Sequence, residues 1–445
     1  MKVAVLGAGI TGAVLTRALH EQGHHVVCLE ASARTGGLCG SETIEGFVCD
    51  RAGGHIIYSK DEEVLRYVLE ATSHVGHHTT ERDTCIYEYG RHVSYPFENG
   101  LADLPSVARF ECVRGYVEAT FSRRNGSPIP DNFHDWCLWR FGEGISQHFM
   151  HPYNEKIWNV DLRDLGVEWV DGRVPDAPLE DVLRSALGTR TVGYGHQAIF
   201  HYPLTGGFES IVDGVLRHIP TGIVQTNSPC STLEKTSSGW LVNGESYDRV
   251  ISTIPLQELA KVLAEIPEDV ASSFGKLDYT SLLTVFLALN RPEVPPRSWI
   301  YFPHAADGPQ NRITYLSNYS PQNAPPGKSS IMAEVTFHGD LPATEEVITK
   351  QVIEGLVQSG MVAPAEIMWT RTFESRYAYI LYRQDLETNL ARVRAWCRSQ
   401  ELDIVGRFAN YDYFNSDGCI RAALDLAATY AYLSGSGDQD QPKAR

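Results

Sequence analysis

Three glycines and one acid near the start of the chain have a spacing that could hold a phosphate-containing ligand. Gly7, Gly9 and Gly12 follow the pattern G-x-G-x-x-G, and Glu30 comes eighteen residues after the last of them. Glycine allows a tight turn and a close approach of ligand to backbone, and the free N–H groups of a helix N-terminus favour a pyrophosphate. A carboxylate at that distance can accept from a ribose hydroxyl. The pattern predicts dinucleotide binding, and an ordinary glycine turn in an α/β core is the alternative.

The elements around these residues have the order that such a motif requires. Residues 2–6 (KVAVL) form a short apolar run of strand type, and residues 13–22 carry apolar side chains at helical spacing. Gly23 ends this helix, and residues 25–29 predict a second strand that leads directly to Glu30. The order of strand, glycine turn, helix, strand and acid is that of a Rossmann-like domain.

Two further glycine pairs follow the acid. Arg34 and Gly36-Gly37 continue a Glu-x3-Arg-x-Gly-Gly pattern from Glu30, and Gly53-Gly54-His55 comes shortly after. This arrangement resembles the FAD-binding glutathione-reductase class of flavoproteins, in its amine-oxidase and mutase branch. The resemblance implies FAD, because an NAD dehydrogenase would not usually carry the second glycine pair. Two ordinary glycine turns are the alternative interpretation.

Length, composition and charge restrict the functions that are open to the protein. The chain has 445 residues, a hydrophobic content of 43% and a formal net charge of −17. Such a composition is typical of a globular protein of two or three domains, and the charge argues against nucleic acid or an anionic membrane as a partner. Nine cysteines show no metal-ligand spacing, so we expect reduced thiols and no metal site. Reduced thiols predict a cytoplasmic protein, and we expect neither a signal peptide nor a membrane-spanning run.

The rest of the pattern predicts an α/β fold in which the nucleotide-binding domain is interrupted twice. We expect the FAD-binding domain to comprise residues 1–90, 201–260 and 401–433. A mainly helical inserted substrate domain is expected at residues 91–200, an antiparallel-sheet substrate domain at 261–400, and a flexible tail at 434–445. The predicted helices are 61–71, 133–141, 144–153, 180–190, 208–218, 345–358 and 417–433, and the predicted strands include 56–58, 223–226, 240–243, 247–253, 282–289, 331–337, 366–372 and 402–405.

Several stretches together resemble the UDP-galactopyranose mutase family, nearer its eukaryotic-type branch. They keep their order over nearly the whole chain, and no single one of them is specific. The stretches are Gly53-Gly54-His55-Ile56-Ile57, Tyr95-Pro96-Phe97-Glu98-Asn99, His151-Pro152-Tyr153-Asn154-Glu155-Lys156-Ile157-Trp158, Trp169-Val170-Asp171-Gly172-Arg173-Val174, Tyr202-Pro203 with Gly206-Gly207, Trp299-Ile300-Tyr301-Phe302-Pro303, Arg312, Ser317-Asn318-Tyr319-Ser320-Pro321, Tyr377-Ala378-Tyr379, and Gly406-Arg407-Phe408 with Tyr413.

The resemblance implies a reaction without net oxidation or reduction. Enzymes of this family interconvert the pyranose and furanose forms of a nucleotide sugar through an adduct between N5 of reduced FAD and the sugar. The implied partners are a nucleotide-diphosphate sugar and a reductant such as NADPH or NADH, and the oligomeric state stays open. Since the flavin supplies the covalent chemistry, we expect no Ser-His-Asp triad and no pair of catalytic carboxylates.

The resemblance also assigns roles to individual side chains. Arg173 and Arg312 match two arginines that bind the diphosphate, and a guanidinium can bind phosphate through two hydrogen bonds. His55 matches a histidine beside the flavin. The alternatives are surface ion pairs for the arginines and core positions for the aromatic residues. The implied substrate-binding residues are Tyr95, Phe97, Glu98, Asn154, Trp158, Tyr301, Tyr319, Tyr377 and Tyr413, with Tyr379 competing with Tyr377.

The implied cofactor-binding residues come from both ends of the chain. The N-terminus of the last helix is expected beside the flavin, where its N–H groups would stabilise negative charge. The full set is Gly7, Gly9, Thr11, Gly12, Glu30, Ala31, Arg34, Gly36, Gly37, Leu38, Gly53, Gly54, His55, Gly406, Arg407, Asp417 and Gly418.

Two positions depart from the family pattern. Glu98 stands where the family commonly has a Gln beside the uracil, and Asp417-Gly418-Cys419-Ile420 replaces an Asn-Gln-Asp-His run. The nucleotide base and the sugar therefore stay open. A redox flavoenzyme of the same fold, such as an amine oxidase or desaturase, is the alternative function, and a flavin-binding protein without catalysis is a third.

Overall fold

A five-stranded parallel sheet gathers strands from three distant stretches of the chain. The computed structural model describes residues 1–170, 174, 177–189 and 199–435. The sheet has the order β19-β13-β1-β2-β9, and all its neighbouring strands are parallel. Its strands are β1 (Lys2–Leu6), β2 (His25–Leu29), β9 (Val224–Gln225), β13 (Arg249–Ser252) and β19 (Leu402–Ile404). The strands predicted at 2–6 and 25–29 are confirmed, and the short apolar runs suit a sheet covered on both faces.

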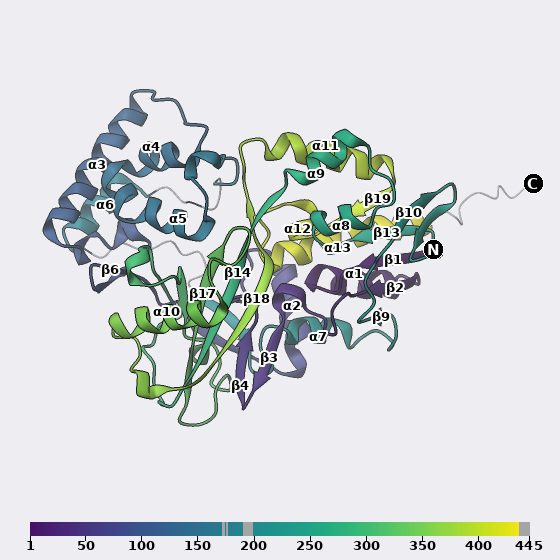
Figure 1. The fold of residues 1–445 in the computed structure, drawn as a ribbon, viewed down its shortest axis with the longest axis horizontal. Helices are drawn as coiled ribbons and strands as arrows, with labels where there is room; N and C mark the ends of the chain where they lie inside the picture. The colour runs from purple at the N-terminus through teal and green to yellow at the C-terminus, as the bar shows by residue number, and fades with distance from the viewer. Residues whose placement is uncertain (171–173, 175–176, 190–198, 436–445) are drawn as a thin grey trace, which may run out of the picture.

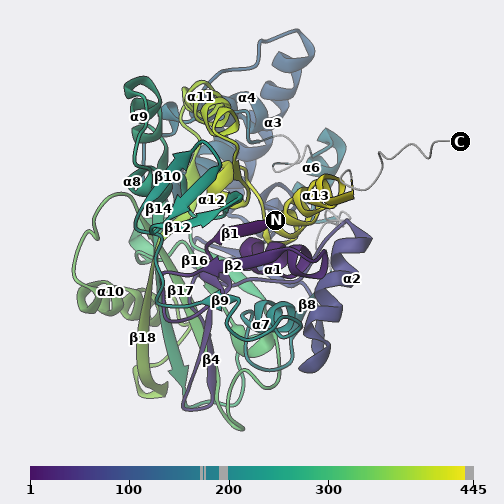
Figure 2. The same cartoon turned by 90° about the vertical axis from the view of Figure 1, so that its right-hand side faces the viewer.

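Helices from the two chain ends cover one face of this sheet. The helix α1 (Ile10–Glu21) packs against α13 (Ser416–Gly435) and α7 (Ser210–Leu216), and Val3 and Val5 of β1 lie in the same core. Ala4 and Leu6 point to the opposite face, into a core shared with β11 (Gly239–Val242) and α11 (Leu386–Ser399). Figure 2 shows β1 and β2 between these layers. The alternation of β1 therefore buries both of its faces.

A seven-stranded sheet forms the middle of the molecule (Figure 1). Its order is β18-β14-β17-β16-β15-β6-β7, and all pairs are antiparallel except β15 with β6. The strands are β6 (Thr84–Glu88), β7 (Arg91–Ser94), β14 (Asp278–Leu289), β15 (Trp299–Tyr301), β16 (Arg312–Thr314), β17 (Ser329–Phe337) and β18 (Ile367–Leu381). The helix α10 (Glu345–Gln358) is confirmed with its predicted bounds and packs on this sheet. β18 continues nine residues beyond the strand predicted to end at residue 372.

A helical block lies at the end of the molecule away from the parallel sheet (Figure 1). It contains α3 (Ser106–Arg124), α4 (Phe133–Ile145), a π-helical turn (Ser146–Met150), α5 (His151–Trp158) and α6 (Leu179–Ala186). These helices lie within residues 91–200, the segment that the sequence predicts to be mainly helical. The cluster of buried aromatic and aliphatic side chains inside this block extends to Leu381 of β18, so the block and the central sheet share packing.

Several predicted elements are wrong or incomplete. Residues 56–58 form no strand, because only Ile57 makes an isolated bridge to His201. The hairpin of β3 (Ser41–Ile44) and β4 (Phe47–Asp50) and the pair of β5 (His77–Glu81) with β8 (Ile199–Pro203) were not predicted. Residues 434 and 435, placed in the flexible tail, belong to α13, and the remainder of that tail is outside the described residues. Among the described helices, none is long and apolar enough to cross a membrane.

Candidate functional site

The glycine turn after β1 forms a cradle at the N-terminus of α1. Gly7 has a φ of +94°, which leads the chain sharply out of the strand. A Cβ on Gly12 would lie 1.9 Å from the Gly7 carbonyl oxygen, so only glycine allows α1 to pack this closely. A Cβ on Gly9 would meet nothing nearer than 3.9 Å. The open approach to Gly9 and the α1 N–H groups fit a pyrophosphate.

Glu30 at the end of β2 is held beside this turn. Its Oε2 accepts from the Ala8 backbone N–H at 2.8 Å, and its Oε1 accepts from the backbone N–H and hydroxyl of Ser32 at 2.9 and 2.8 Å. The carboxylate is thus oriented at the carboxyl ends of β1 and β2, where doubly wound sheets bind their ligands. This position suits a ribose hydroxyl of a dinucleotide.

The Gly36-Gly37 pair packs directly on the Gly7–Gly12 turn. Gly36 N–H donates to the Ala8 carbonyl at 2.9 Å, and Gly9 and Gly36 form a parallel bridge. Arg34 donates to the Ser41 carbonyl at 2.7 Å and contacts Glu209. Arg34 therefore holds the loop after β2 in place. Of the two other predicted residues here, Ala31 is exposed and Leu38 is half-buried.

The C-terminal segment reaches the same cradle. A Cβ on Gly406 would lie 3.0 Å from Thr11 Oγ1, and Arg407 lies over the rings of Tyr413 and Tyr379, 4.9 and 5.8 Å from their centroids. Asp417 near the start of α13 accepts from Ser59 Oγ at 2.9 Å, and Gly418 is in the first turn of that helix. The structure thus brings the predicted N-terminal and C-terminal cofactor residues together.

We expect Gly12→Ala to lose most of its bound flavin. The added methyl group would collide with the Gly7 carbonyl and push α1 away from β1. The ratio of flavin to protein absorbance after purification measures the effect. Gly275→Ala is the control, because it lies at the end of α9 (Glu268–Gly275) and its Cβ would meet nothing within 4 Å. Full flavin content in Gly12→Ala would contradict the cradle.

His55 lies at the junction between this cradle and the central sheet. Its Nδ1 is 2.9 Å from the Gly53 carbonyl oxygen, so Nδ1 carries the proton and donates, and its ring stacks on Phe208 at 5.1 Å. Burial lowers the pKa of His55 to about 4, and the nearby Arg312 and Arg407 act in the same direction. The imidazole is therefore neutral at pH 7, with Nε2 as an acceptor.

This depressed pKa predicts a pH dependence of stability. The unfolded imidazole takes up its proton near pH 6.5 and the folded one only near pH 4, so the folded state loses stability as the pH falls through this window. His55→Gln removes that contribution. Its free energy of unfolding should fall less steeply than that of the wild type between pH 6.5 and 4. Parallel curves from urea unfolding at several pH values would show that His55 does not titrate in this way.

Arg312 and Glu334 form a bidentate ion pair next to His55. Arg312 Nε and a terminal guanidinium nitrogen donate to the Glu334 oxygens at 2.8 Å each, and the two residues are partners in the β16–β17 register. Glu334 is 1% exposed and also accepts from the Gly54 N–H at 3.1 Å. Although burial opposes the charge, the Glu334 carboxylate raises the pKa of Arg312 well above its usual value. Arg312 is therefore a fixed cation.

Tyrosines surround this fixed cation. Tyr301 packs against Tyr95 at 5.3 Å and against Tyr153 at 5.2 Å, and Tyr153, Tyr301 and Tyr379 all interact electrostatically with Arg312. Burial raises the pKa of Tyr153, Tyr319 and Tyr379, so these hydroxyls keep their protons and can donate. The structure thus assembles a set of hydroxyl donors around one guanidinium.

The structure separates the two tyrosines that the sequence left open. Tyr379 lies beside Trp158 and Arg407 and close to Glu334. Tyr377 donates its hydroxyl to Glu258 and packs on Tyr279 at 4.5 Å. Tyr379 is therefore the one that the fold brings to Arg312.

The other predicted substrate residues take mostly buried positions. Trp158 Nε1 donates to Asn154 Oδ1 at 3.1 Å, and Asn154 Nδ2 donates to the Met150 carbonyl at 2.7 Å. Phe97 is buried and stacks on Phe149, and Glu98 is 7% exposed and interacts electrostatically with Tyr95. Tyr319 is buried against Phe200 and Tyr202. Tyr413 stacks on Trp169 and Tyr382. Arg173 lies outside the described residues.

Glu334 and Tyr153 belong to this cluster and were absent from the predicted set. Glu334 is an acid in the otherwise apolar run Ile331-Met332-Ala333-Glu334-Val335. A charged residue in a buried strand is rare unless it is paired, so that run contained a usable signal. Tyr153 lies inside a stretch that carries the family resemblance, but only its ring contact with Tyr301 identifies its direction.

Comparisons with known proteins agree with this geometry. A family model described as flavin containing amine oxidoreductase matches residues 10–364. A structure of reduced UDP-galactopyranose mutase is 27% identical with a TM-score of 0.89, and the alignment covers 97% of this chain and 94% of that one. Cyclohexylamine oxidase from Brevibacterium oxydans is 16% identical with a TM-score of 0.70 over 98% and 99% of the two chains, which indicates a shared fold.

A curated relative matches a shorter stretch. It is an uncharacterized protein in the nifH2 3′ region of Methanothermococcus thermolithotrophicus, 44% identical over 69 residues. The match spans 16% of this chain and 66% of that relative, just under two thirds of its length. The resemblance to UDP-galactopyranose mutase predicted from the sequence is confirmed by the structural similarity, and the family model covers most of the chain. The chain therefore belongs to the flavin-containing amine oxidoreductase family.

Proposed function

We propose that the protein is a flavin-dependent nucleotide-sugar mutase that interconverts pyranose and furanose ring forms, similar to UDP-galactopyranose mutase. The proposal includes FAD bound by a domain of the glutathione-reductase type, active when reduced, with NADPH or NADH as the reductant. The 27% identity to a reduced UDP-galactopyranose mutase over nearly the full length of both chains supports it.

One observation carries the proposal beyond the family. Arg312 is fixed by the buried Glu334 in a cluster of protonated tyrosines, directly beside His55. Guanidinium and hydroxyl donors together suit a diphosphate, which offers many acceptor oxygens and negative charge. An enzyme that removes hydride from an amine has no anion of this kind to bind.

The side chains then have distinct tasks. Arg312 binds the diphosphate and stabilises the charge that grows on it as it leaves the sugar, and Tyr301, Tyr379 and Tyr413 donate hydroxyls to its oxygens. His55, neutral at pH 7, offers Nε2 as an acceptor toward the cofactor. Trp158 and Asn154 hydrogen-bond to each other on α5 and form the α5 wall of the sugar site. When bound, reduced FAD supplies a nucleophilic nitrogen for the anomeric carbon.

The alternative is a redox flavoenzyme of the same fold. Cyclohexylamine oxidase is among its structural neighbours, but at 16% identity this likeness concerns the fold alone. The arginine–tyrosine cluster favours the mutase.

A single assay separates these functions. The purified, FAD-loaded protein is incubated with UDP-galactose and other nucleotide sugars, with and without dithionite, and in separate samples without dithionite it is given amines or the same sugars while oxygen is recorded. A mutase forms the furanose isomer only when reduced and consumes no oxygen in the conversion. Amine-dependent oxygen consumption without isomerisation would establish the redox alternative. NADPH and NADH are then compared as reductants in place of dithionite.

Glu98 predicts a preference among nucleotide bases. It is 7% exposed and lies close enough to Tyr95 to raise the pKa of that hydroxyl further, after burial and Tyr301. An ionised carboxylate only accepts, and guanine offers two adjacent donors where uracil offers one. We expect GDP to bind the reduced protein about tenfold or more tighter than UDP, with CDP in between, since an unpaired base edge costs ~1–3 kcal/mol. Titrations of the wild type and Glu98→Gln measure this, and tightest binding of UDP in both would contradict it.

A further inference from the structure

The helix α5 joins the helical block to the central sheet, and Lys156 contributes to this junction through its side chain. Lys156 Nζ donates to the carbonyl oxygens of Phe302 and His304 at 3.0 Å each. These carbonyls belong to the segment that follows β15. A lysine side chain is long and flexible, so two fixed acceptors define its position as well as that of its helix.

The segment held by Lys156 is the one that carries a tyrosine of the candidate site. Tyr301, the last residue of β15, immediately precedes Phe302, and its ring packs on Tyr153 at 5.2 Å. Tyr153 and Lys156 are three residues apart on α5 and thus lie on the same side of the helix. The Lys156 contact therefore sets the separation between Tyr153 and Tyr301, which both interact electrostatically with Arg312.

The main chain of Lys156 is fixed as firmly as its side chain. The Lys156 carbonyl accepts from Thr336 Oγ1 at 3.0 Å and from Asn159 Nδ2 at 2.9 Å. Asn159 Nδ2 also reaches Thr336 Oγ1 at 3.1 Å. Thr336 is in β17, two residues after Glu334 on the same face of that strand. One residue of α5 is thus tied both to the strand of Glu334 and to the segment after Tyr301.

The side-chain amino group of Lys156 is buried, which makes its charged form less favourable. Burial lowers the pKa of Lys156 to about 7, against the opposing influence of Asp307. The other ionisable groups around it are His304 and the buried Glu88 of β6, which pair with each other at 2.8 Å, and Glu88 raises the pKa of His304. Because the unfolded chain binds this proton more readily than the folded one, the buried amino group costs stability as the pH falls from 10.5 to about 7. The two hydrogen bonds to Phe302 and His304 oppose this cost.

We propose that Lys156 is a positioning residue that sets α5 against the Tyr301 segment and so determines how tightly the nucleotide diphosphate is bound. The inference rests on the proposed function for the identity of the ligand. The geometry of the contact is independent of that function.

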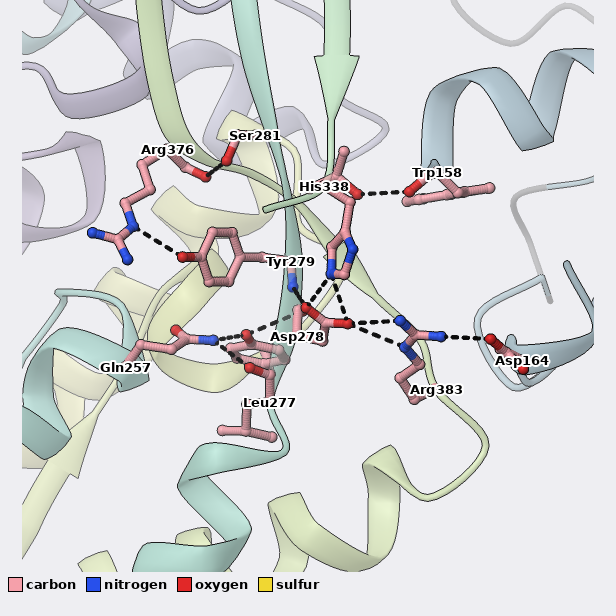
Figure 3. Close-up of polar contacts among 12 residues, drawn as sticks. Trp158, Asp164, Gln257, Leu277, Asp278, Tyr279, Ser281, His338, Arg376 and Arg383 are labelled. Atoms are coloured by element: carbon pink, nitrogen blue, oxygen red, sulfur yellow. Dashed lines mark hydrogen bonds and ion pairs between the residues drawn. The ribbon is translucent and has the colours of Figure 1, made fainter. Parts of the chain in front are cut away.

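A second, separate anchor makes this inference testable. Beyond α5, Asp164 contacts Arg383 at 3.0 Å, and Arg383 and His338 both contact Asp278 at the start of β14, at 2.9 and 2.8 Å (Figure 3). The Trp158 carbonyl is also held from β14, where Thr280 Oγ1 donates to it at 3.2 Å. Because none of these contacts involves Lys156, its replacement should shift α5 locally while the block stays attached.

The experiment compares Lys156→Met, Lys156→Arg and Lys350→Met. Methionine keeps the length of the side chain and removes its hydrogen-bond donors, and arginine keeps donors at that position. Lys350 is an exposed lysine on α10 that lies 3.7 Å from Glu354. Hydrogen exchange of peptides covering residues 151–158 and 299–304 is measured first. UDP and GDP affinities of the dithionite-reduced, FAD-loaded proteins follow, and then kcat and KM for any accepted nucleotide sugar.

We expect at least threefold faster exchange in both segments of Lys156→Met and about tenfold weaker binding of the nucleotide diphosphate. KM should rise by a similar factor, with kcat within threefold and FAD content unchanged. Lys156→Arg should recover most of the affinity, and Lys350→Met should match the wild type. Unchanged exchange in Lys156→Met overturns the positioning role whatever the ligand. If the wild type binds neither UDP nor GDP, the proposed function fails, while the exchange result still decides the role of Lys156. A Lys156→Met protein that does not fold would also overturn the inference, since the second anchor should hold it.

Discussion

Replacing Arg312 by alanine is expected to lower mutase turnover by roughly 10- to 100-fold or more while FAD stays bound. A hydrogen bond to a charged group contributes ~1.5–3 kcal/mol, and the contribution grows as the diphosphate takes up charge in the transition state. Within the described residues, the Arg312 side chain hydrogen-bonds to Glu334 and to the Gly54 carbonyl and not to Gly7 or Glu30. The cofactor contacts around Gly7 and Glu30 should therefore persist, and the FAD content of the purified variant checks this. Single-turnover rates of the reduced enzyme at saturating substrate measure the loss.

Two further variants separate charge from geometry at this position. Arg312→Lys keeps a positive charge opposite Glu334 but cannot bind with a planar pair of donors, so it should fold like the wild type and still lose most of its turnover. Arg184→Ala is the control, because Arg184 is 57% exposed and forms a surface pair with Glu180 at 2.6 Å. Near wild-type turnover of Arg312→Ala would remove Arg312 from the diphosphate site. From the sequence resemblance, Arg173→Ala is expected to behave in the same way.

The cofactor cradle could be predicted because its signal is local. Gly7, Gly9, Gly12 and Glu30 lie within one strand–helix–strand unit, and each spacing has a direct structural reason. That Gly406 packs on Thr11 depends on the crossing of β19 beside β13, which no local pattern encodes. Only the family resemblance placed these distant segments together.

The arginine–tyrosine cluster was less predictable because it depends on strand register. Tyr377 and Tyr379 are two residues apart and so lie on the same face of β18, where alternation cannot distinguish them. Their different neighbours distinguish them. Tyr377 contacts Glu258 and Tyr279, whereas Tyr379 contacts Trp158. A register irregularity between Thr280 and Leu282 of β14 lies opposite this part of β18.

The hairpin of β3 and β4 was not predicted from the sequence because its turn has an unusual residue. Its two-residue turn consists of Glu45 and Gly46, with φ of 50° and 85°. Positive φ at both positions is typical of a type I′ turn, for which Asn-Gly or Asp-Gly is the usual signal. Glu rarely adopts this conformation, so Glu45-Gly46 did not indicate a hairpin turn.

Replacing Glu334 by alanine is expected to lower the free energy of unfolding by about 3–5 kcal/mol. Glu334 is 1% exposed and Arg312 is 21% exposed, so the variant leaves a largely buried guanidinium without its counter-charge. The Gly54 N–H also loses its acceptor, and Gly54 directly precedes His55. Loss of this carboxylate is therefore expected to affect both Arg312, the proposed diphosphate ligand, and the segment that carries His55.

A double-mutant cycle tests whether the effect arises from the pair. The cycle compares Arg312→Met, Glu334→Leu and the double variant that carries both. The double variant loses both charges together, so its loss of unfolding free energy should be much smaller than the sum of the losses of the two single variants. Urea unfolding of each FAD-loaded protein gives the free energies. Glu180→Ala, which breaks the exposed pair with Arg184, should cost no more than about 1 kcal/mol. If Glu334→Ala proves as mild as Glu180→Ala, or if the single effects simply add, then Glu334 does not hold Arg312 in place, and the fixed cation that supports the mutase function is lost with it.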